Sequence, residues 1–201
     1  MHDHDHAHDH DHAHDHHHDL GHGRTDDPAA AILANRADKD AYFAVSLDSP
    51  IPPSERFPFA GLAYFPVDLA YRIEGLELTP YDGDGPHEFV IPTSDDDQRP
   101  ALRAGTFRFE LGGRELALVA YDLGTGSLFV PFLDATSGVE TYGAGRYLDI
   151  EPEDDGTCTL DFNAAYHPYC AYSPEYSCPL TPAENRLAVR IEAGERLPAG
   201  D

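Results

Sequence analysis

The hydrophobic and polar positions along the chain predict one helix followed by a series of short strands. The helix covers residues 25–46. Asp26 or Asp27 fits its N-cap, and Pro28 fits its first helical position. Four prolines in the segment that follows end the helix. Its expected apolar face is modest and consists of Ile32, Leu33, Ala37, Ala41 and Ala44, with Phe43 beside it.

The rest of the chain shows the alternation of apolar and polar residues that is typical of β-strands. The clearest hairpin lies at 106–122, where Gly112 and Gly113 fit a two-residue turn between two alternating segments. Gly75 interrupts an earlier strand at 70–78 and predicts a bulge there. Further strands are expected at 88–93, 127–134, 146–152, 154–163 and 186–194.

These segments predict a mainly β fold, a barrel or sandwich of about eight short antiparallel strands preceded by one α-helix. A doubly wound α/β fold is disfavoured because helices do not alternate with the strands. The 201 residues divide into a tail, 1–27, and a single β-rich domain, 28–201. The domain is long enough to bury a sizeable core.

The charge balance changes the interpretation of the surface, because the chain has 37 acidic residues and only 13 basic ones. The first 27 residues hold eight acids and one base, so the domain itself carries about 17 negative charges. Molar salt shortens the screening length to about 3 Å and removes most of this self-repulsion. We therefore interpret the chain as a protein of a salt-adapted archaeon, with an acidic surface for a basic partner as the alternative. Nucleic acid is disfavoured as a partner because no basic stripe is present.

Other composition features bear on location and redox state. No run of 18 apolar residues is present, so we expect neither a membrane span nor a membrane partner. The N-terminus lacks the basic and apolar regions of a signal peptide, which predicts a cytoplasmic protein. The three cysteines, Cys158, Cys170 and Cys178, form no CxxC pair, and their odd number argues against a disulfide framework.

Histidine alternates with Asp or Ala in residues 2–23, a composition that predicts a disordered tail. Neutral imidazole binds zinc and nickel, and these histidines could hold about two or three ions at tetrahedral stoichiometry. An engineered tag and the drift of a short DNA repeat are the alternatives to a selected metal-binding arm. The domain itself is expected to require no cofactor. The candidate metal ligands are His2, His4, His6, His8, His10, His12, His14, His16, His17, His18 and His22.

Several distinctive phrases occur in a specific order: SPIPP, FAGLAYFPVD, LFVPFLDATSGVETYGAGRYLD and DFNAAYHPYCAYSPEYSCPLTPAENRL. In these phrases the chain resembles domain-of-unknown-function family 1684 over about residues 28–197, and the histidine-rich tail lies outside that pattern. The resemblance implies no particular activity. Members of the family tend to have Asn where this chain has His167, which argues against His167 as an essential metal ligand.

Tyrosines and polar residues crowd together in the last third of the chain. Six tyrosines fall between positions 142 and 176, in long loops of the kind that form binding walls or packed caps. The planar guanidinium of Arg146 could hold an anionic or carboxylate-bearing ligand, with a buried salt-bridge network as the alternative. The ligand-binding candidates are Tyr142, Arg146, Asp161, Asn163, Tyr166, Glu184 and Asn185.

Metal and acid–base chemistry are weaker interpretations of the same region. His167, Cys170 and Cys178 could bind a metal ion, but their spacing matches no standard zinc signature, and buried structural thiols are the simpler interpretation. Asp161 and Glu184 could act as an acid–base pair, although such pairs arise by chance in so acidic a chain.

Two common catalytic motifs are absent from the sequence. Neither Ser127 nor Ser137 lies in a nucleophile elbow, and no helix is expected after the glycines of YGAGRY, as a dinucleotide site requires. We therefore expect a β domain that binds a small polar or anionic ligand and carries a zinc- or nickel-binding tail. The alternatives are a hydrolase or lyase with an Arg/carboxylate pocket, and a metal-handling accessory protein.

Overall fold

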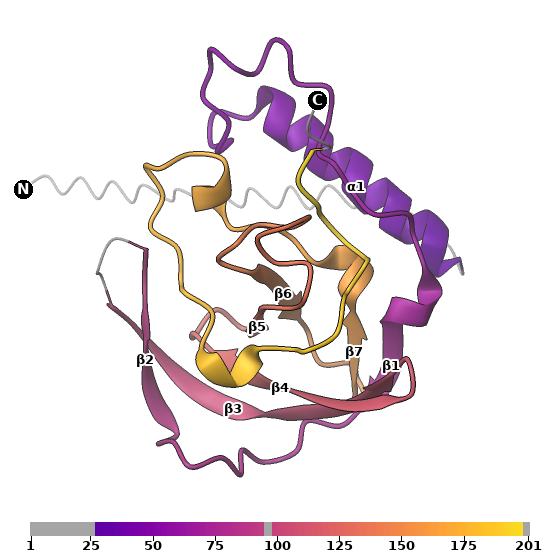
Figure 1. Ribbon diagram of the computed structural model, residues 1–201, viewed down its shortest axis with the longest axis vertical. Helices are drawn as coiled ribbons and strands as arrows, with labels where there is room; N and C mark the ends of the chain where they lie inside the picture. The colour runs from indigo at the N-terminus through magenta and orange to yellow at the C-terminus, as the bar shows by residue number, and fades with distance from the viewer. Residues whose placement is uncertain (1–26, 95–97, 199–201) are drawn as a thin grey trace, which may run out of the picture.

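The computed structural model describes residues 27–94 and 98–198, whose arrangement is shown in Figure 1. The predicted histidine-rich tail lies outside the described residues. Within them, one helix precedes seven strands. These elements are α1 (Pro28–Val45), β1 (Arg72–Leu76), β2 (Glu88–Pro92), β3 (Gln98–Leu111), β4 (Arg114–Asp122), β5 (Leu128–Phe132), β6 (Arg146–Ile150) and β7 (Cys158–Asp161).

The strands form two antiparallel sheets. Five of them make one curled sheet in the order β2-β3-β4-β5-β6, and β1 pairs with β7 in a separate ribbon. In Figure 1, β2, β3 and β4 curve around one side of the molecule, and α1 lies across the opposite side. The mainly β fold with one N-terminal helix is thus confirmed. In the described part of the chain, no helix combines the length and apolar composition needed to span a membrane.

The β3–β4 hairpin and the β1 bulge agree with the sequence-based expectations. Gly112 and Gly113 form the turn with φ of 60° and 73°, values that L side chains rarely adopt. β4 is the middle strand of the five, so this hairpin organises the sheet. Gly75 has a φ of 66° and lies where the β1–β7 register shifts.

The inner face of α1 differs from the predicted alanine stripe. Asp27 caps the helix, as expected, by accepting backbone N–H groups. Leu33 is exposed, however, and so are Ala37 and Ala41. The residues that turn inward are Ile32, Arg36, Lys39 and Phe43. These four residues are three or four positions apart and therefore lie on one face of the helix. The two long cationic side chains reach oxygen atoms on the body of the protein.

The prediction of a final strand at 186–194 is wrong. This segment forms no regular strand. Its first half pairs briefly with residues 133–135, where the Leu187 N–H donates to the Leu133 carbonyl oxygen and the Ala135 N–H donates to the Val189 carbonyl oxygen. Farther along, the guanidinium of Arg146 donates to three carbonyl oxygens, those of residues 191, 193 and 195. Apolar side chains from the segment still enter the core. The alternating pattern therefore reports burial, while the backbone bonds partly to a neighbouring segment and partly to one buried cation.

The five-stranded sheet is buried on both faces. One face packs against β7 and the C-terminal segment through Phe107, Leu118, Phe132, Leu148, Leu160 and Ile191, among others. The other face carries Ile91, Ala101, Val119, Tyr121, Phe129 and Tyr147. Alternation along β5 and β6 thereby sends Phe129 and Tyr147 toward α1, where the candidate site lies.

Candidate functional site

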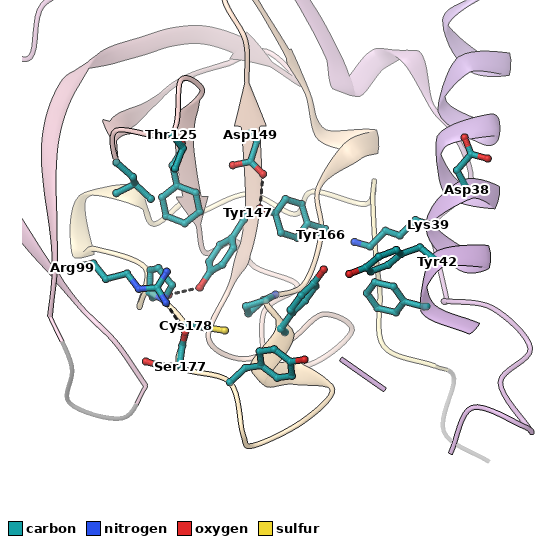
Figure 2. Close-up of a pocket in the computed structure, with 17 residues that line it drawn as sticks. Asp38, Lys39, Tyr42, Arg99, Thr125, Tyr147, Asp149, Tyr166, Ser177 and Cys178 are labelled. Carbon is teal, nitrogen blue, oxygen red and sulfur yellow. Dashed lines mark hydrogen bonds between the residues drawn. The ribbon is translucent and has the colours of Figure 1, made fainter. Parts of the chain in front are cut away.

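A pocket of about 740 Å³ lies between α1, the β5–β6 part of the sheet and the loop 166–179 (Figure 2). We call it the aromatic pocket. Its size and largely aromatic lining are typical of small-molecule sites. Its ring-bearing lining residues are Tyr42, Phe43, Phe129, Tyr147, Tyr166, Tyr169 and Tyr176. Its polar lining residues are Asp38, Lys39, Arg99, Thr125, Asp149, Ser177 and Cys178.

The rings that form the walls hold one another in place. Tyr147 on β6 and Tyr166 exchange two backbone hydrogen bonds, and their rings meet edge to face with centroids 5.7 Å apart. Phe43 on α1 meets Tyr169 at 6.0 Å, and Tyr169 meets Tyr176 at 5.2 Å. Edge-to-face pairs fix ring orientation, so flat apolar surfaces face the pocket before any ligand enters.

Two cationic side chains reach the pocket from opposite sides. Figure 2 shows Lys39 pointing from α1 toward Tyr166, and Arg99 on the other side beside Ser177. The Lys39 Nζ lies 4.7 Å from the centroid of the Tyr166 ring. The Arg99 guanidinium donates to the Ser177 carbonyl oxygen at 3.1 Å, and no ion pair joins Arg99 to a carboxylate within residues 27–94 and 98–198.

Asp149 is one of two acidic residues that line the pocket, the other being Asp38. Its carboxylate accepts the Tyr166 hydroxyl at 2.6 Å. Burial, and then the Asp149 charge, raise the pKa of Tyr166 well above its usual range. The phenol therefore stays protonated and donates to Asp149, which leaves the face of its ring toward Lys39.

Lys39 is positioned by a buried carboxylate. It forms an ion pair with Glu195, whose side chain is only 1% exposed. Glu195 also accepts the Tyr172 hydroxyl at 2.6 Å and the His167 backbone N–H at 2.7 Å. Since all three donors converge on one carboxylate, the charge is compensated, and α1 is fastened to the C-terminal segment.

His167 is neutral and has a structural role. Its Nε2 accepts the backbone N–H of Tyr142 at 3.2 Å, which leaves the proton on Nδ1. Burial lowers the pKa of His167 to about 4, with Arg146 and Lys39 lowering it further and Glu195 opposing them. The imidazole ring is therefore uncharged at neutral pH, and its hydrogen bond links His167 to the backbone of Tyr142.

A second depression, the helix groove, has a volume of about 950 Å³ and runs between α1 and the β1–β7 ribbon. Asp161 and Asn163 line it together with Tyr166. Asp161 accepts a hydrogen bond from Arg72 at 2.9 Å and two from Asn163, each at 2.9 Å. Asn163 also bridges both backbone groups of Asp68. The side chains of Asp161 and Asn163 are thus engaged with their neighbours in the protein.

Glu184 lies in a third and smaller depression, of about 410 Å³, on the convex β3–β4 region. Its Oε1 accepts from the Arg103 guanidinium at 2.8 and 3.0 Å and from the Tyr121 hydroxyl at 2.8 Å. Burial alone would raise the pKa of Glu184, but these hydrogen bonds lower it below its usual value. Asp161 and Glu184 occupy separate depressions, so they do not form a carboxylate pair.

Of the other three sequence candidates, two bond to backbone groups and one contacts a thiol. Arg146 is fully buried and bonds to carbonyl oxygens and to Asp134. Asn185 is also fully buried and bridges Val119 on β4 to Pro131 on β5, where those strands diverge. Tyr142 is half-buried, and its hydroxyl points to the Cys170 Sγ at 3.9 Å.

The structure therefore divides the seven predicted ligand residues among several places. Only Tyr166 lines the aromatic pocket, and it also lines the helix groove with Asp161 and Asn163. The sequence analysis missed Lys39 and Arg99 as site residues. The signal for Lys39 was present, because the only lysine of the chain stands on the helix face that also carries Ile32 and Phe43.

No cluster of three or more His, Cys, Asp or Glu side chains with metal-binding geometry occurs in the described residues. His167 lies beside Glu195 and Tyr142, and the Cys178 sulfur lies against the backbone N–H of Cys170. The eleven tail histidines fall outside the part of the chain that the structure describes.

Comparisons with other proteins place the fold but assign no activity. Residues 58–196 match the family described as "Protein of unknown function (DUF1684)". The chain is similar to an uncharacterized protein of Haloarcula marismortui whose structure was determined in solution by NMR, with 40% sequence identity and a TM-score of 0.61. The similarity covers 83% of this chain and 92% of that one. A comparison with curated proteins gave no match.

Proposed function

The chain belongs to the DUF1684 family, whose function is unknown, so we propose a function from its own residues: the aromatic pocket binds a small anionic ligand that carries a flat ring. The observation that carries this proposal is the placement of Lys39 and Arg99 on opposite sides of an aromatic pocket, in a chain of formal net charge −24. The same charge supports adaptation to high salt.

The ring specificity follows from the walls. Seven aromatic side chains line the pocket, and the pairs Tyr147–Tyr166 and Tyr169–Tyr176 are fixed edge to face. A flat ring can slide against such faces with little loss of side-chain freedom, because these rings are already ordered. A volume of about 740 Å³ suits a ligand of one to three rings.

The charge preference follows from the two cations. Arg99 has a planar fork that can pair with a carboxylate, sulfonate or phosphate, and within the described residues its guanidinium donates to the Ser177 carbonyl oxygen and forms no ion pair. Because Lys39 is already paired with Glu195, its charge is largely compensated. Its main contribution is the contact of its Nζ with the face of the Tyr166 ring. Arg99 is therefore the main anchor for the anionic group of the ligand.

The test uses two fluorescent probes that share their rings. The first is 1-anilinonaphthalene-8-sulfonate, which is anionic, and the second is N-phenyl-1-naphthylamine, which lacks the sulfonate. We expect the anionic probe to bind the full chain more tightly. Arg99→Gln should weaken its binding about three- to tenfold, as loss of one partly exposed charge contact does, and should leave binding of the neutral probe unchanged.

Arg108→Gln is the matched control, because Arg108 is also an exposed arginine on β3 but faces Asp82 in the third depression. It should bind both probes as the unsubstituted protein does. Near-ultraviolet circular dichroism should first establish that the two variants are folded alike. Equal binding of the anionic probe by both variants, or equal binding of the two probes by the unsubstituted protein, would refute the proposal.

We also propose that the tail histidines bind zinc or nickel. Eleven of the first 22 residues are histidine, and neutral imidazole is a preferred ligand for both ions. Deleting residues 2–23 should remove about two or three bound ions from a calorimetric titration and leave the melting temperature nearly unchanged. Affinity should fall between about pH 7.5 and 5.5, because protonated imidazole does not bind metal.

The full chain and the deleted chain form the matched pair for this experiment. Unchanged stoichiometry after the deletion would assign the metal to residues 24–201 instead. A titration in 2 M and in 0.1 M potassium chloride then separates metal coordination from loose attraction to the aspartates. The screening length is about 2 Å at the higher salt concentration and about 10 Å at the lower one. Metal–nitrogen bonds are short-range and survive this screening, whereas the loose attraction does not.

A further inference from the structure

Cys178 lines the aromatic pocket and lies against the backbone of Cys170, and neither cysteine takes part in the proposed binding. The backbone N–H of Cys170 donates to the Sγ of Cys178 at 3.2 Å. Both thiols are free; Cys178 is buried and Cys170 is partly exposed. From the sequence they were interpreted as buried structural thiols; seven residues lie between them, and they form no CxxC motif.

The backbone around each cysteine is held by its own hydrogen bonds. Cys178 is fixed at the end of β2, where its N–H donates to the Ser94 hydroxyl at 3.1 Å and its carbonyl oxygen accepts the Ser94 N–H at 3.0 Å. Cys170 lies in a 3₁₀ turn, Tyr169–Ala171, closed by hydrogen bonds to the Pro168 and Tyr169 carbonyl oxygens. The fold therefore holds the Cys178 sulfur against the backbone of Cys170, within reach of its side chain.

We propose that Cys170 and Cys178 form a redox-active dithiol, which closes to an intramolecular disulfide bond when a small disulfide oxidant is present. The pair is a modification site independent of the proposed ligand. Cys170 is the sulfur that an oxidant in solution can reach, and Cys178 is the resolving sulfur beside it.

The reaction proceeds by two thiol–disulfide exchanges. The Cys170 thiolate attacks glutathione disulfide, which forms a protein–glutathione bond and releases one glutathione thiolate. The Cys178 thiolate then attacks the Cys170 sulfur, which forms the internal bond and releases the second glutathione. Two cysteines lose two electrons and two protons, and one glutathione disulfide becomes two glutathione thiols. Burial and the adjacent Cys178 thiol raise the pKa of Cys170 to about 11, so the first exchange is slow at neutral pH.

Closure of the disulfide would fix one wall of the aromatic pocket. Ser177 and Cys178 line that pocket (Figure 2), and so do the edge-to-face rings of Tyr169, beside the closed loop, and Tyr176, within it. This consequence rests on the proposed function, whereas disulfide formation does not. A covalent link between residues 170 and 178 should make the loop harder to open and slow both entry and release of the anionic probe.

The test treats the native full chain with glutathione disulfide at about pH 8 and follows intact mass. We expect the protein to lose the mass of two hydrogen atoms, and digestion should yield one cross-linked peptide that joins Cys170 to Cys178. Cys178→Ser should instead retain one glutathione on Cys170, because no resolving thiol remains. Cys158→Ser is the matched control; Cys158 is buried on β7, and this variant should close as the unsubstituted protein does.

A second measurement needs no substitution. The equilibrium constant for closure should be at least about tenfold higher in the native chain than in the urea-unfolded chain, since the native fold already holds the sulfurs in place. Equal constants, a native protein that does not react, or one that keeps glutathione on Cys170 would each overturn the proposal. Mass and peptide mapping report on the dithiol alone, so failure of probe binding in the pocket would not be mistaken for failure of this inference.

Discussion

Buried polar side chains hold together the parts of this molecule where strands end or diverge. Arg146 bonds to three carbonyl oxygens of the C-terminal segment, and Asn185 spans the gap between β4 and β5. Asn163 bonds to the N–H and the carbonyl oxygen of Asp68, in the segment before β1. Each of these side chains satisfies backbone groups that would otherwise be buried without a partner, at a cost of about 1–3 kcal/mol apiece.

These residues also explain why the sequence and the structure point to different candidate sites. Polar side chains gathered near the C-terminus suggested ligand contacts, but a sequence does not show which of them the backbone already occupies. Arg146, Asn163 and Asn185 are occupied in this way, whereas Tyr166 reaches a pocket. Lys39 could have been found from its helix position. Arg99 could not, because its importance depends on how far β3 extends beyond the predicted hairpin.

The buried imidazole of His167 should make stability depend on pH. Its pKa is about 4 in the folded chain, against about 6.5 in an unfolded one, so the unfolded chain binds the proton more readily. The stabilisation is present above pH 6.5 and is lost as pH falls toward 4, for a total of roughly 3 kcal/mol. Urea unfolding at a series of pH values should show this loss. His167→Asn should reduce it, since an amide oxygen can still accept the Tyr142 N–H but does not titrate.

His87→Asn provides the control for this measurement. His87 is exposed, so its replacement should leave the pH dependence of unfolding as it is in the unsubstituted protein. If the His167 and His87 variants retain the same loss of stability between pH 6.5 and 4, the dependence comes from other groups, and His167 does not stay neutral in the folded chain.

At the scale of elements, alternation and turn chemistry predicted the sheet well. The β3–β4 hairpin, the Gly75 bulge and the Asp27 cap are all present. They could be predicted because each depends on residues close in sequence. The 186–194 segment was misjudged, because alternation reports only which side chains are buried. Its backbone bonds to residues 133 and 135 and to the Arg146 guanidinium, all of them 40 or more residues away.

The Gly112–Gly113 turn offers a direct test of the hairpin. Both residues have positive φ and open space around them, so a side chain would meet backbone strain rather than a clash. Replacing both with Val should cost about 2–4 kcal/mol, at roughly 1–2 kcal/mol for each residue. The midpoint of urea unfolding should fall accordingly.

Gly112→Asn is the matched control, because Asn followed by Gly is the preferred sequence for this kind of turn. It should retain most of the stability of the unsubstituted protein. A double Val variant that unfolds at the same urea concentration as the Asn variant would show that the turn strain is relieved elsewhere and that the hairpin does not require these glycines.

At the scale of the whole molecule, like charges meet even within the sheet. The hairpin register places Glu110 directly opposite Glu115, and both are exposed. Cross-strand pairs of like charge are destabilising in dilute buffer. Together with the negative excess of the whole chain, this pair indicates a surface whose repulsion is relieved by dissolved ions.

We therefore expect the melting temperature to rise between 0.1 and 1 M potassium chloride, as the screening length falls from about 10 to 3 Å. Glu115→Lys should add about 0.5 kcal/mol of stability at the lower concentration, and this gain should shrink at the higher one. Thermal melts of the two proteins across the salt series are the measurement. A flat midpoint, or a gain for Glu115→Lys that does not depend on salt, would contradict the proposed salt adaptation.

The ion pair between Lys39 and Glu195 also orders events during synthesis. Glu195 is made 156 residues after Lys39, so α1 leaves the ribosome long before its anchor exists. At about 5–20 residues per second, Lys39 waits on the order of ten seconds for this carboxylate, whereas Arg36 needs only Phe65 for its first hydrogen bond to the body of the protein. The strands of the five-stranded sheet are complete by residue 150, so they can pair within that interval. The Lys39–Glu195 ion pair is thus among the last contacts available to the chain, and the Lys39 side of the aromatic pocket cannot be complete before it forms.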